Sequence, residues 1–154
     1  MITQEERTEI SDEIKKAPSK KAAVIDALKV IQRHRGWVPD GPLEEVAGLL
    51  GMTPDDVDGV ATFFSLIFRR PVGKHVILIC DSVSCWLVGY EDIKAHLMNR
   101  LGVSMGETTK DGRFTLLPSA CLGVCEQAPA MMIDETLYTK LTPSVVDGIL
   151  EKYL

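Results

Sequence analysis

Hydrophobic positions in the first third of the chain recur at helical spacing. Val24, Leu28 and Ile31 lie three or four residues apart, so they share one face of a helix. The same kind of pattern predicts four helices, near residues 3–16, 20–34, 43–50 and 53–62. Because short loops join them, we expect the four helices to pack as a small bundle.

The polar residues at the ends of these segments support the helix assignments. Thr3 and Glu6 have the spacing of a capping box, in which each side chain accepts a hydrogen bond from the backbone N–H of the other residue. Thr53 and Pro54 supply an N-cap and a proline at the first helical position. Gly36 is suited to a left-handed C-cap. We interpret residues 37–42 as a connector.

The hydrophobic pattern changes after residue 62. Residues 63–68 are rich in phenylalanine, and their spacing does not distinguish a helix from an extended segment. They are either part of the core or a docking surface for another protein. Pro71-Val72-Gly73 predicts a turn. We therefore expect a boundary there, with a helical bundle in residues 1–70 and a second domain in residues 71–154.

The second domain alternates between strand and helix patterns. A nearly continuous apolar run at 74–79 predicts a buried strand, and residues 89–100 follow with helical spacing. A strand at 113–117, a hairpin over 130–140 and a helix from Thr142 complete the order. This order predicts a thioredoxin-like arrangement, in which a parallel crossover unit precedes a hairpin and a helix. The fold class is then α+β, and Pro129 occupies the position of a cis-proline.

Composition and charge narrow the function classes. The chain is 45% hydrophobic and 25% charged, which is usual for a globular protein. Acidic residues outnumber basic ones in both parts, 12 to 10 in residues 1–70 and 10 to 7 in residues 71–154, so a nucleic-acid partner is not expected. No apolar run approaches 18 residues, and the polar N-terminus does not resemble a signal peptide. We expect a cytoplasmic protein without direct membrane insertion.

All four cysteines lie in two short loops of the second domain. Cys80 and Cys85 follow the first predicted strand, and Cys121 and Cys125 follow the second. Because the carboxyl ends of neighbouring parallel strands lie side by side, the two pairs can converge although 35 residues separate them. In a reducing compartment such cysteines are more often ligands than disulfides. The pattern predicts an all-sulfur metal site.

The spacing within each pair favours a [2Fe–2S] cluster. Structural zinc sites usually use tighter C-x₂-C loops, and a Rieske centre needs two histidine ligands that the cysteine loops lack. Gly123 suits a loop whose backbone passes close to a cluster. Structural zinc and redox-active thiols stay open as alternatives. Asp81 and Glu126, beside the cysteines, would oppose an added electron, and Trp86 is either a shield for the site or an ordinary packing residue.

Several motifs of this chain, in the same order, are similar to those of a known protein family. The chain resembles the E subunits of bacterial NADH:quinone oxidoreductase, respiratory complex I, from about residue 20 to the end. The motifs are Gly36-Trp37-Val38-Pro39, Val57-Asp58-Gly59-Val60-Ala61-Thr62-Phe63-Phe64-Ser65, Arg70-Pro71-Val72-Gly73, the two cysteine loops, Gly106-Glu107-Thr108-Thr109, Asp111-Gly112-Arg113-Phe114-Thr115-Leu116 and Ala128-Pro129.

This resemblance implies a thioredoxin-like [2Fe–2S] ferredoxin domain behind an N-terminal helical bundle. Cys80, Cys85, Cys121 and Cys125 match the cluster ligands of the family one for one. The resemblance implies that FMN and NADH are bound by the neighbouring flavoprotein, the F subunit, and that this chain exchanges electrons with that flavin. We expect no catalytic residue here, because the chain has no glycine-rich nucleotide-binding motif.

The same resemblance bears on assembly and location. The helical bundle is expected to act as a scaffold or docking arm, and the whole chain to belong to a peripheral arm at the inner face of the cell membrane. Related subunits also serve NAD-linked hydrogenases and formate dehydrogenases, so the resemblance identifies the module better than the enzyme that contains it.

Overall fold

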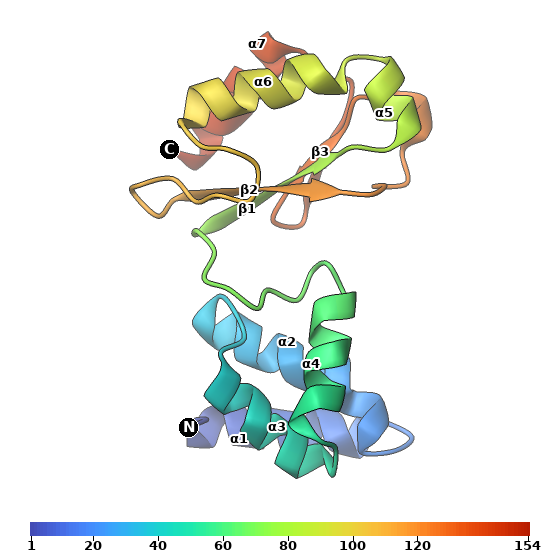
Figure 1. Ribbon diagram of the computed structural model, residues 1–154, viewed down its shortest axis with the longest axis vertical. Helices are drawn as coiled ribbons and strands as arrows, with labels where there is room; N and C mark the ends of the chain where they lie inside the picture. The colour runs from blue at the N-terminus through green and yellow to red at the C-terminus, as the bar shows by residue number, and fades with distance from the viewer. The chain divides into compact units, whose positions relative to one another are not determined.

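The computed structural model describes residues 1–154, which form two compact units, Met1–Pro71 and Val72–Leu154 (Figure 1). The first unit is entirely helical and the second contains a four-stranded sheet. None of the helices is long and apolar enough to cross a membrane. The predicted α+β fold class, with a helical bundle followed by a thioredoxin-like domain, is confirmed.

Four α-helices build the first unit, and the predicted capping residues begin the first and the fourth of them. They are α1 (Gln4–Lys16), α2 (Val24–Arg35), α3 (Asp40–Leu50) and α4 (Pro54–Phe63), with a short 3₁₀ turn at Lys21–Ala23. The Thr3 and Glu6 side chains form the expected capping box, and so do Thr53 and Asp56. Gly36 ends α2 with a positive φ of 79°, a conformation that glycine adopts without strain.

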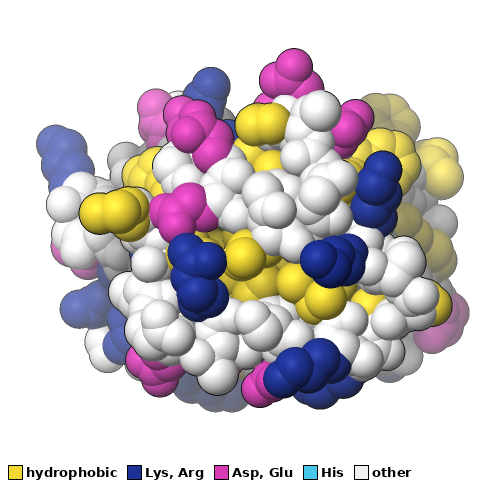
Figure 2. Space-filling model, turned by 90° about the horizontal axis from the view of Figure 1, so that it is seen from below, with side chains coloured by type: hydrophobic (Ala, Val, Ile, Leu, Met, Phe, Trp, Pro, Cys, Tyr) yellow, Lys and Arg dark blue, Asp and Glu magenta, His cyan; other side chains and the backbone are white.

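The core of the helical unit is formed by the apolar stripes that the spacing predicts. Leu28, Ile31 and Val57 are completely buried in it. Figure 2 looks onto this unit, and its visible face carries interspersed acidic and basic side chains with apolar side chains between them.

The third helix is longer than predicted, since it begins at Asp40 and takes Pro42 into its first turn. Proline is tolerated there because the first N–H groups of a helix have no intrahelical partner.

The phenylalanine-rich segment after α4 is mostly exposed. Phe63 is 81% exposed and Leu66 53%, whereas Ile67 is buried at 6%. The interpretation of this segment as core is therefore wrong, except for Ile67. Its backbone is nevertheless held in place, since the Gln32 amide donates to the Leu66 carbonyl at 2.8 Å and accepts from the Phe68 N–H at 2.7 Å.

The second unit follows the predicted order of strands and helices, with one additional helix. Its elements are β1 (His75–Cys80), α5 (Val83–Leu87), α6 (Tyr90–Leu101), β2 (Phe114–Ser119), β3 (Met131–Ile133), β4 (Thr136–Tyr138) and α7 (Pro143–Leu150), with 3₁₀ turns at Cys125–Gln127 and Glu151–Tyr153. In Figure 1, α6 and α7 lie on the same side of the sheet. The sheet order is β2-β1-β3-β4.

The central strand β1 determines where the cysteine loops lie. It pairs in parallel with β2 and antiparallel with β3, and Cys80 is opposite Ser119 in the parallel register. Every residue of β1 after His75 is buried, as its apolar run predicts. The Ala128–Pro129 peptide bond is cis, which confirms the expectation for Pro129. Because β1 and β2 are parallel, both cysteine loops leave the sheet at the same end of these two hydrogen-bonded strands.

Candidate metal centre

The first cysteine loop begins where β1 ends. The Asp81 N–H donates to the Ser119 carbonyl at 3.0 Å, so the chain leaving β1 stays bonded to the end of β2. It then turns into α5, the helix that the sequence did not predict, and this helix places Cys85 in the core at 2% exposure. Cys80 is buried as well, at 3%. The inner pair of thiols is thus shielded from water.

The second cysteine loop follows β2 and is open to solvent. The sulfur atoms of Cys121 and Cys125 lie 3.9 Å apart, and both residues are exposed. Between them, Gly123 has a φ of 79°, which turns its N–H toward the Cys121 sulfur at 3.3 Å. A β-carbon at Gly123 would meet no neighbouring atom, so the backbone conformation is what favours glycine there.

The two loops meet at the Cys80 sulfur. Its thiol is close enough to both Cys85 and Cys121 to affect the pKa of each. Burial, followed by the neighbouring Cys80 thiol, raises the pKa of Cys85 to about 11. The Gly123 N–H and then the Cys125 thiol lower the pKa of Cys121. The structure therefore brings together all four of the cysteines that the sequence selects, one pair buried and one pair exposed.

Ala130 is a contributor to the site that the sequence did not reveal. Its carbonyl accepts the Cys80 N–H at 3.1 Å, and its own N–H faces the Cys85 sulfur and opposes the rise in the pKa of that thiol. Ala130 acts only through its backbone, so its side chain gives no chemical signal. The only feature of the sequence that indicated this contact is the preceding residue, Pro129, which lies between the second cysteine loop and β3.

The spacing of the exposed cysteine pair suits two thiolates bound to one metal atom. In a tetrahedral site with metal–sulfur bonds of about 2.3 Å, two thiolates on one metal lie about 3.8 Å apart. The Cys121–Cys125 separation of 3.9 Å matches that value. The four free thiols also supply the number of cysteine ligands that a [2Fe–2S] cluster takes.

The histidines all have acidic partners elsewhere in the chain. His34 contacts Glu9 at 2.7 Å, and His75 contacts Asp134 at 2.7 Å. His96 contacts an aspartate of α7 at 2.9 Å. Their contacts with carboxylates away from the cysteine loops agree with the interpretation that they are not ligands of the cysteine site.

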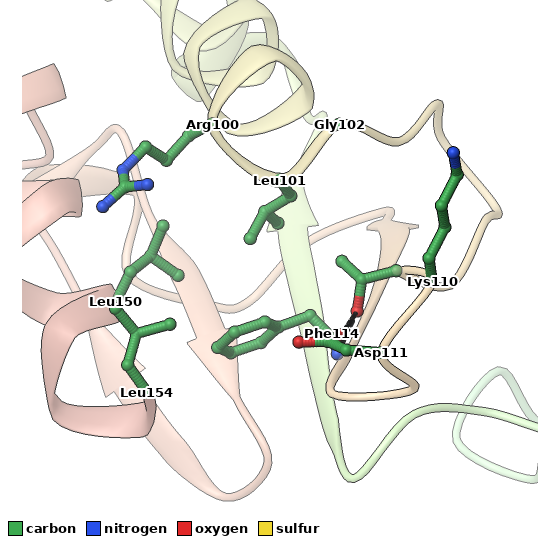
Figure 3. Close-up of a pocket in the computed structure, with 9 residues that line it drawn as sticks. Arg100, Leu101, Gly102, Lys110, Asp111, Phe114, Leu150 and Leu154 are labelled. Carbon is green, nitrogen blue, oxygen red and sulfur yellow. Dashed lines mark hydrogen bonds between the residues drawn. The ribbon is translucent and has the colours of Figure 1, made fainter.

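One hollow of the second unit lies away from the cysteines. It has a volume of about 440 Å³, and none of its nine lining residues is a cysteine. Figure 3 shows the side chains of Leu101, Phe114, Leu150 and Leu154 facing one another across it, with Arg100 and Lys110 at its sides. It is not part of the candidate metal centre.

Comparison with known proteins assigns a family to the chain. Residues 10–154 match the family model described as "Thioredoxin-like [2Fe-2S] ferredoxin". The E subunit of the NADH-quinone oxidoreductase of Escherichia coli strain K12 is 51% identical over 148 residues, which cover 96% of this chain and 89% of the relative. The E subunit of the same enzyme from Pseudomonas aeruginosa strain PAO1 is 46% identical over 154 residues, covering 100% of this chain and 93% of the relative.

A solved structure shares the fold. The crystal structure of an NAD⁺-reducing [NiFe]-hydrogenase in the air-oxidised state aligns with a TM-score of 0.72 and 25% sequence identity. The alignment covers 84% of this chain and 22% of the hydrogenase chain. This chain therefore corresponds to one module of a larger polypeptide in that enzyme.

Proposed function

The chain belongs to the thioredoxin-like [2Fe-2S] ferredoxin family, and on that premise we propose that Cys80, Cys85, Cys121 and Cys125 hold one [2Fe–2S] cluster. The observation that carries this proposal is the meeting of two thiol pairs at the carboxyl ends of β1 and β2. A bound cluster would supply one-electron transfer at this end of the sheet.

The residues around the thiols would make the site suitable for a charged cluster. A [2Fe–2S] centre with four thiolates carries a charge of roughly −2, or −3 when reduced, so N–H donors near sulfur stabilise it. The Gly123 N–H at 3.3 Å from the Cys121 sulfur is such a donor, and the Ala130 N–H serves the buried pair. Burial of Cys80 and Cys85 keeps water from one side of the site.

The chain acts as a non-catalytic electron-transfer subunit of an NADH-quinone oxidoreductase. Its relatives from that enzyme are about half identical over nearly the whole chain. The hydrogenase module is a more distant relative at 25% identity, so the quinone-reducing enzyme is the better-supported assembly. Within it we propose that the electron partner is the flavoprotein that binds NADH and FMN, the F subunit, in a peripheral arm at the inner face of the membrane.

The helical unit would serve as a docking arm in that assembly. It has no cysteine, but it presents Phe63, Phe64 and Leu66 to solvent. The backbone of this segment is hydrogen-bonded to the Gln32 amide. Apolar side chains that are exposed on such a fixed backbone are expected where another subunit covers the surface. Both units of the chain would then contribute to assembly, and only the second to electron transfer.

Anaerobic purification of the full chain tests the cluster directly. We expect two irons and two acid-labile sulfides per chain, visible absorption of a [2Fe–2S] centre, and an electron paramagnetic resonance signal after reduction. Cys125→Ala should lower the iron content strongly, whereas Ser119→Ala, which changes a residue beside the site, should keep both irons. One zinc without sulfide would contradict the proposal, and so would an unchanged iron content in Cys125→Ala.

A further inference from the structure

The helix α5 exposes an unusual amount of apolar surface beside the cysteines. Val83 is 69% exposed, Trp86 57%, Leu87 70% and Val88 56%. These four are more than half of the large exposed apolar side chains in the second unit, which otherwise has only Leu137, Val145 and Leu154. Together they leave on the order of 400 Å² of apolar surface in water, a patch of the size that marks a binding surface on a protein.

This patch is fixed in position by the residue that faces inward. Cys85, in the middle of α5, is buried at 2%, whereas Val83, Trp86 and Leu87 of the same five-residue helix are exposed. The Trp86 N–H donates to the Ser82 carbonyl at 2.9 Å, and the Val88 N–H donates to the Cys85 carbonyl at 3.2 Å. A rigid apolar patch loses little conformational entropy when a partner covers it.

The patch adjoins the exposed cysteine pair. Ser82, at the start of α5, lies next to the Cys121 thiol. The Cys125 thiol is close enough to Cys85 to add to the rise in pKa that burial causes at Cys85. In Figure 1, α5 and the loop that follows β2 lie at the same end of the unit. A protein that covers the patch would therefore also cover the exposed side of the metal centre.

Acidic side chains border the same surface. Asp81 precedes α5, Glu91 and Asp92 lie in the first turn of α6, and Glu126 follows Cys125, all of them exposed. Burial raises the pKa of the Tyr90 hydroxyl, and the nearby charges of Asp81 and Glu91 add to that rise. Only Glu91 has a basic partner, Lys94 at 2.6 Å. The residues that border the patch are thus negatively charged, and three of these four carboxylates have no basic partner.

We propose that α5 is a docking helix for the protein with which the metal centre exchanges electrons, and that this protein presents an apolar surface bordered by Lys and Arg. The proposal rests on the function proposed above, since it assigns a surface to that exchange. An apolar centre with complementary charge around it gives affinity through burial and rapid association through long-range attraction. Trp86 is the expected anchor, because tryptophan is enriched among residues that dominate binding energy.

Binding of the full, cluster-loaded chain to the isolated NADH- and FMN-binding flavoprotein tests this assignment. The test variant is Trp86→Ser with Leu87→Ser, and the matched control is Leu137→Ser with Val145→Ser, two exposed apolar residues of the same unit. We expect the test variant to raise Kd at least tenfold and the control less than twofold. Asp81→Asn with Asp92→Asn should weaken the dependence of the association rate on salt between about 50 and 200 mM, a range over which screening changes appreciably.

The outcomes separate the docking proposal from the function on which it rests. If the unmodified chain holds iron and sulfide and binds the probe, but the α5 variant binds equally well, α5 is not the docking helix and the function stands. If the unmodified chain holds no cluster, the proposed function fails. Sedimentation of the chain alone checks a third case, because self-association that requires Trp86 would assign the patch to a second copy and overturn the proposal. If the serine variant loses iron, Leu87→Lys replaces it.

Discussion

The carboxylate of Glu6 is the most completely engaged acidic group in the helical unit. It is 1% exposed, accepts two hydrogen bonds from Arg35 at 2.6 and 2.7 Å, and accepts the Thr3 N–H at 2.6 Å. The hydrogen bonds from Arg35, followed by the one from the Thr3 backbone, outweigh burial and lower its pKa from 4.5 to about 2. One side chain thus ties the start of α1 to the end of α2.

The lowered pKa sets the expected energetic effect. A difference of about 2.5 pKa units between the unfolded and folded states corresponds to about 3 kcal/mol of stability. Because the folded pKa is the lower one, this stabilisation is complete above pH 4.5 and is lost as the pH falls through 2. Glu6→Gln keeps a hydrogen-bond acceptor but no charge. We expect it to lower the free energy of unfolding at pH 7 by about 2–3 kcal/mol.

Urea unfolding of the full chain measures this loss. Trp37 reports on the helical unit when Trp86 is replaced by phenylalanine in all the proteins compared. The control is Glu5→Gln, which removes an exposed charge from the same helical turn and should change stability by less than about 0.5 kcal/mol. If Glu6→Gln and Glu5→Gln are equally stable at pH 7, the buried ion pair has no net stabilising role and the reasoning is wrong.

Three further predictions concern both units. Gly73→Ala would place a β-carbon 2.9 Å from the Phe114 backbone, so we expect a loss of about 2 kcal/mol in the unfolding free energy of the second unit by urea titration. Asp81→Asn with Glu126→Gln should raise the midpoint potential of the cluster by on the order of 30 mV in a redox titration, since less negative charge opposes the electron; an unchanged potential would contradict this. Phe63→Ser with Leu66→Ser should leave iron content and urea stability unchanged but lower the yield of assembled enzyme after gel filtration. Normal assembly of this variant would refute the docking role of the helical unit.

Much of the architecture is predictable because its signals are local. Thr3 and Glu6 specify the start of α1 through bonds between residues three apart, and Gly36 specifies the end of α2 through its backbone freedom. The convergence of the cysteines is predictable for a different reason. Two strands joined by a helical crossover run parallel, so residues at their carboxyl ends must lie at one edge of the sheet.

The features that the sequence does not reveal depend on contacts between distant residues. The helix α5 is too short and too apolar on its outer side to show an amphipathic pattern, and Cys85 is its only buried residue. Phe63 and Leu66 have the composition of core residues. The backbone at Leu66 is bonded to the Gln32 amide, 34 residues earlier in the chain, and such a distant contact leaves no local pattern in the sequence.

The parallel pairing of β1 with β2 fixes the separation of the two cysteine loops, whatever the length of the connection between the strands. Adjacent strands in a sheet are about 4.8 Å apart whatever the length of the connection that joins them. Cys80 lies opposite Ser119 in this register, and the two loops grow from those fixed ends. The connection between α6 and β2 also bonds to the edge of β2 through the backbones of Gly106, Glu107 and Thr109, so its sequence can vary where those bonds are kept. The fixed separation makes the pair of loops transferable, by design, to another protein with two adjacent parallel strands.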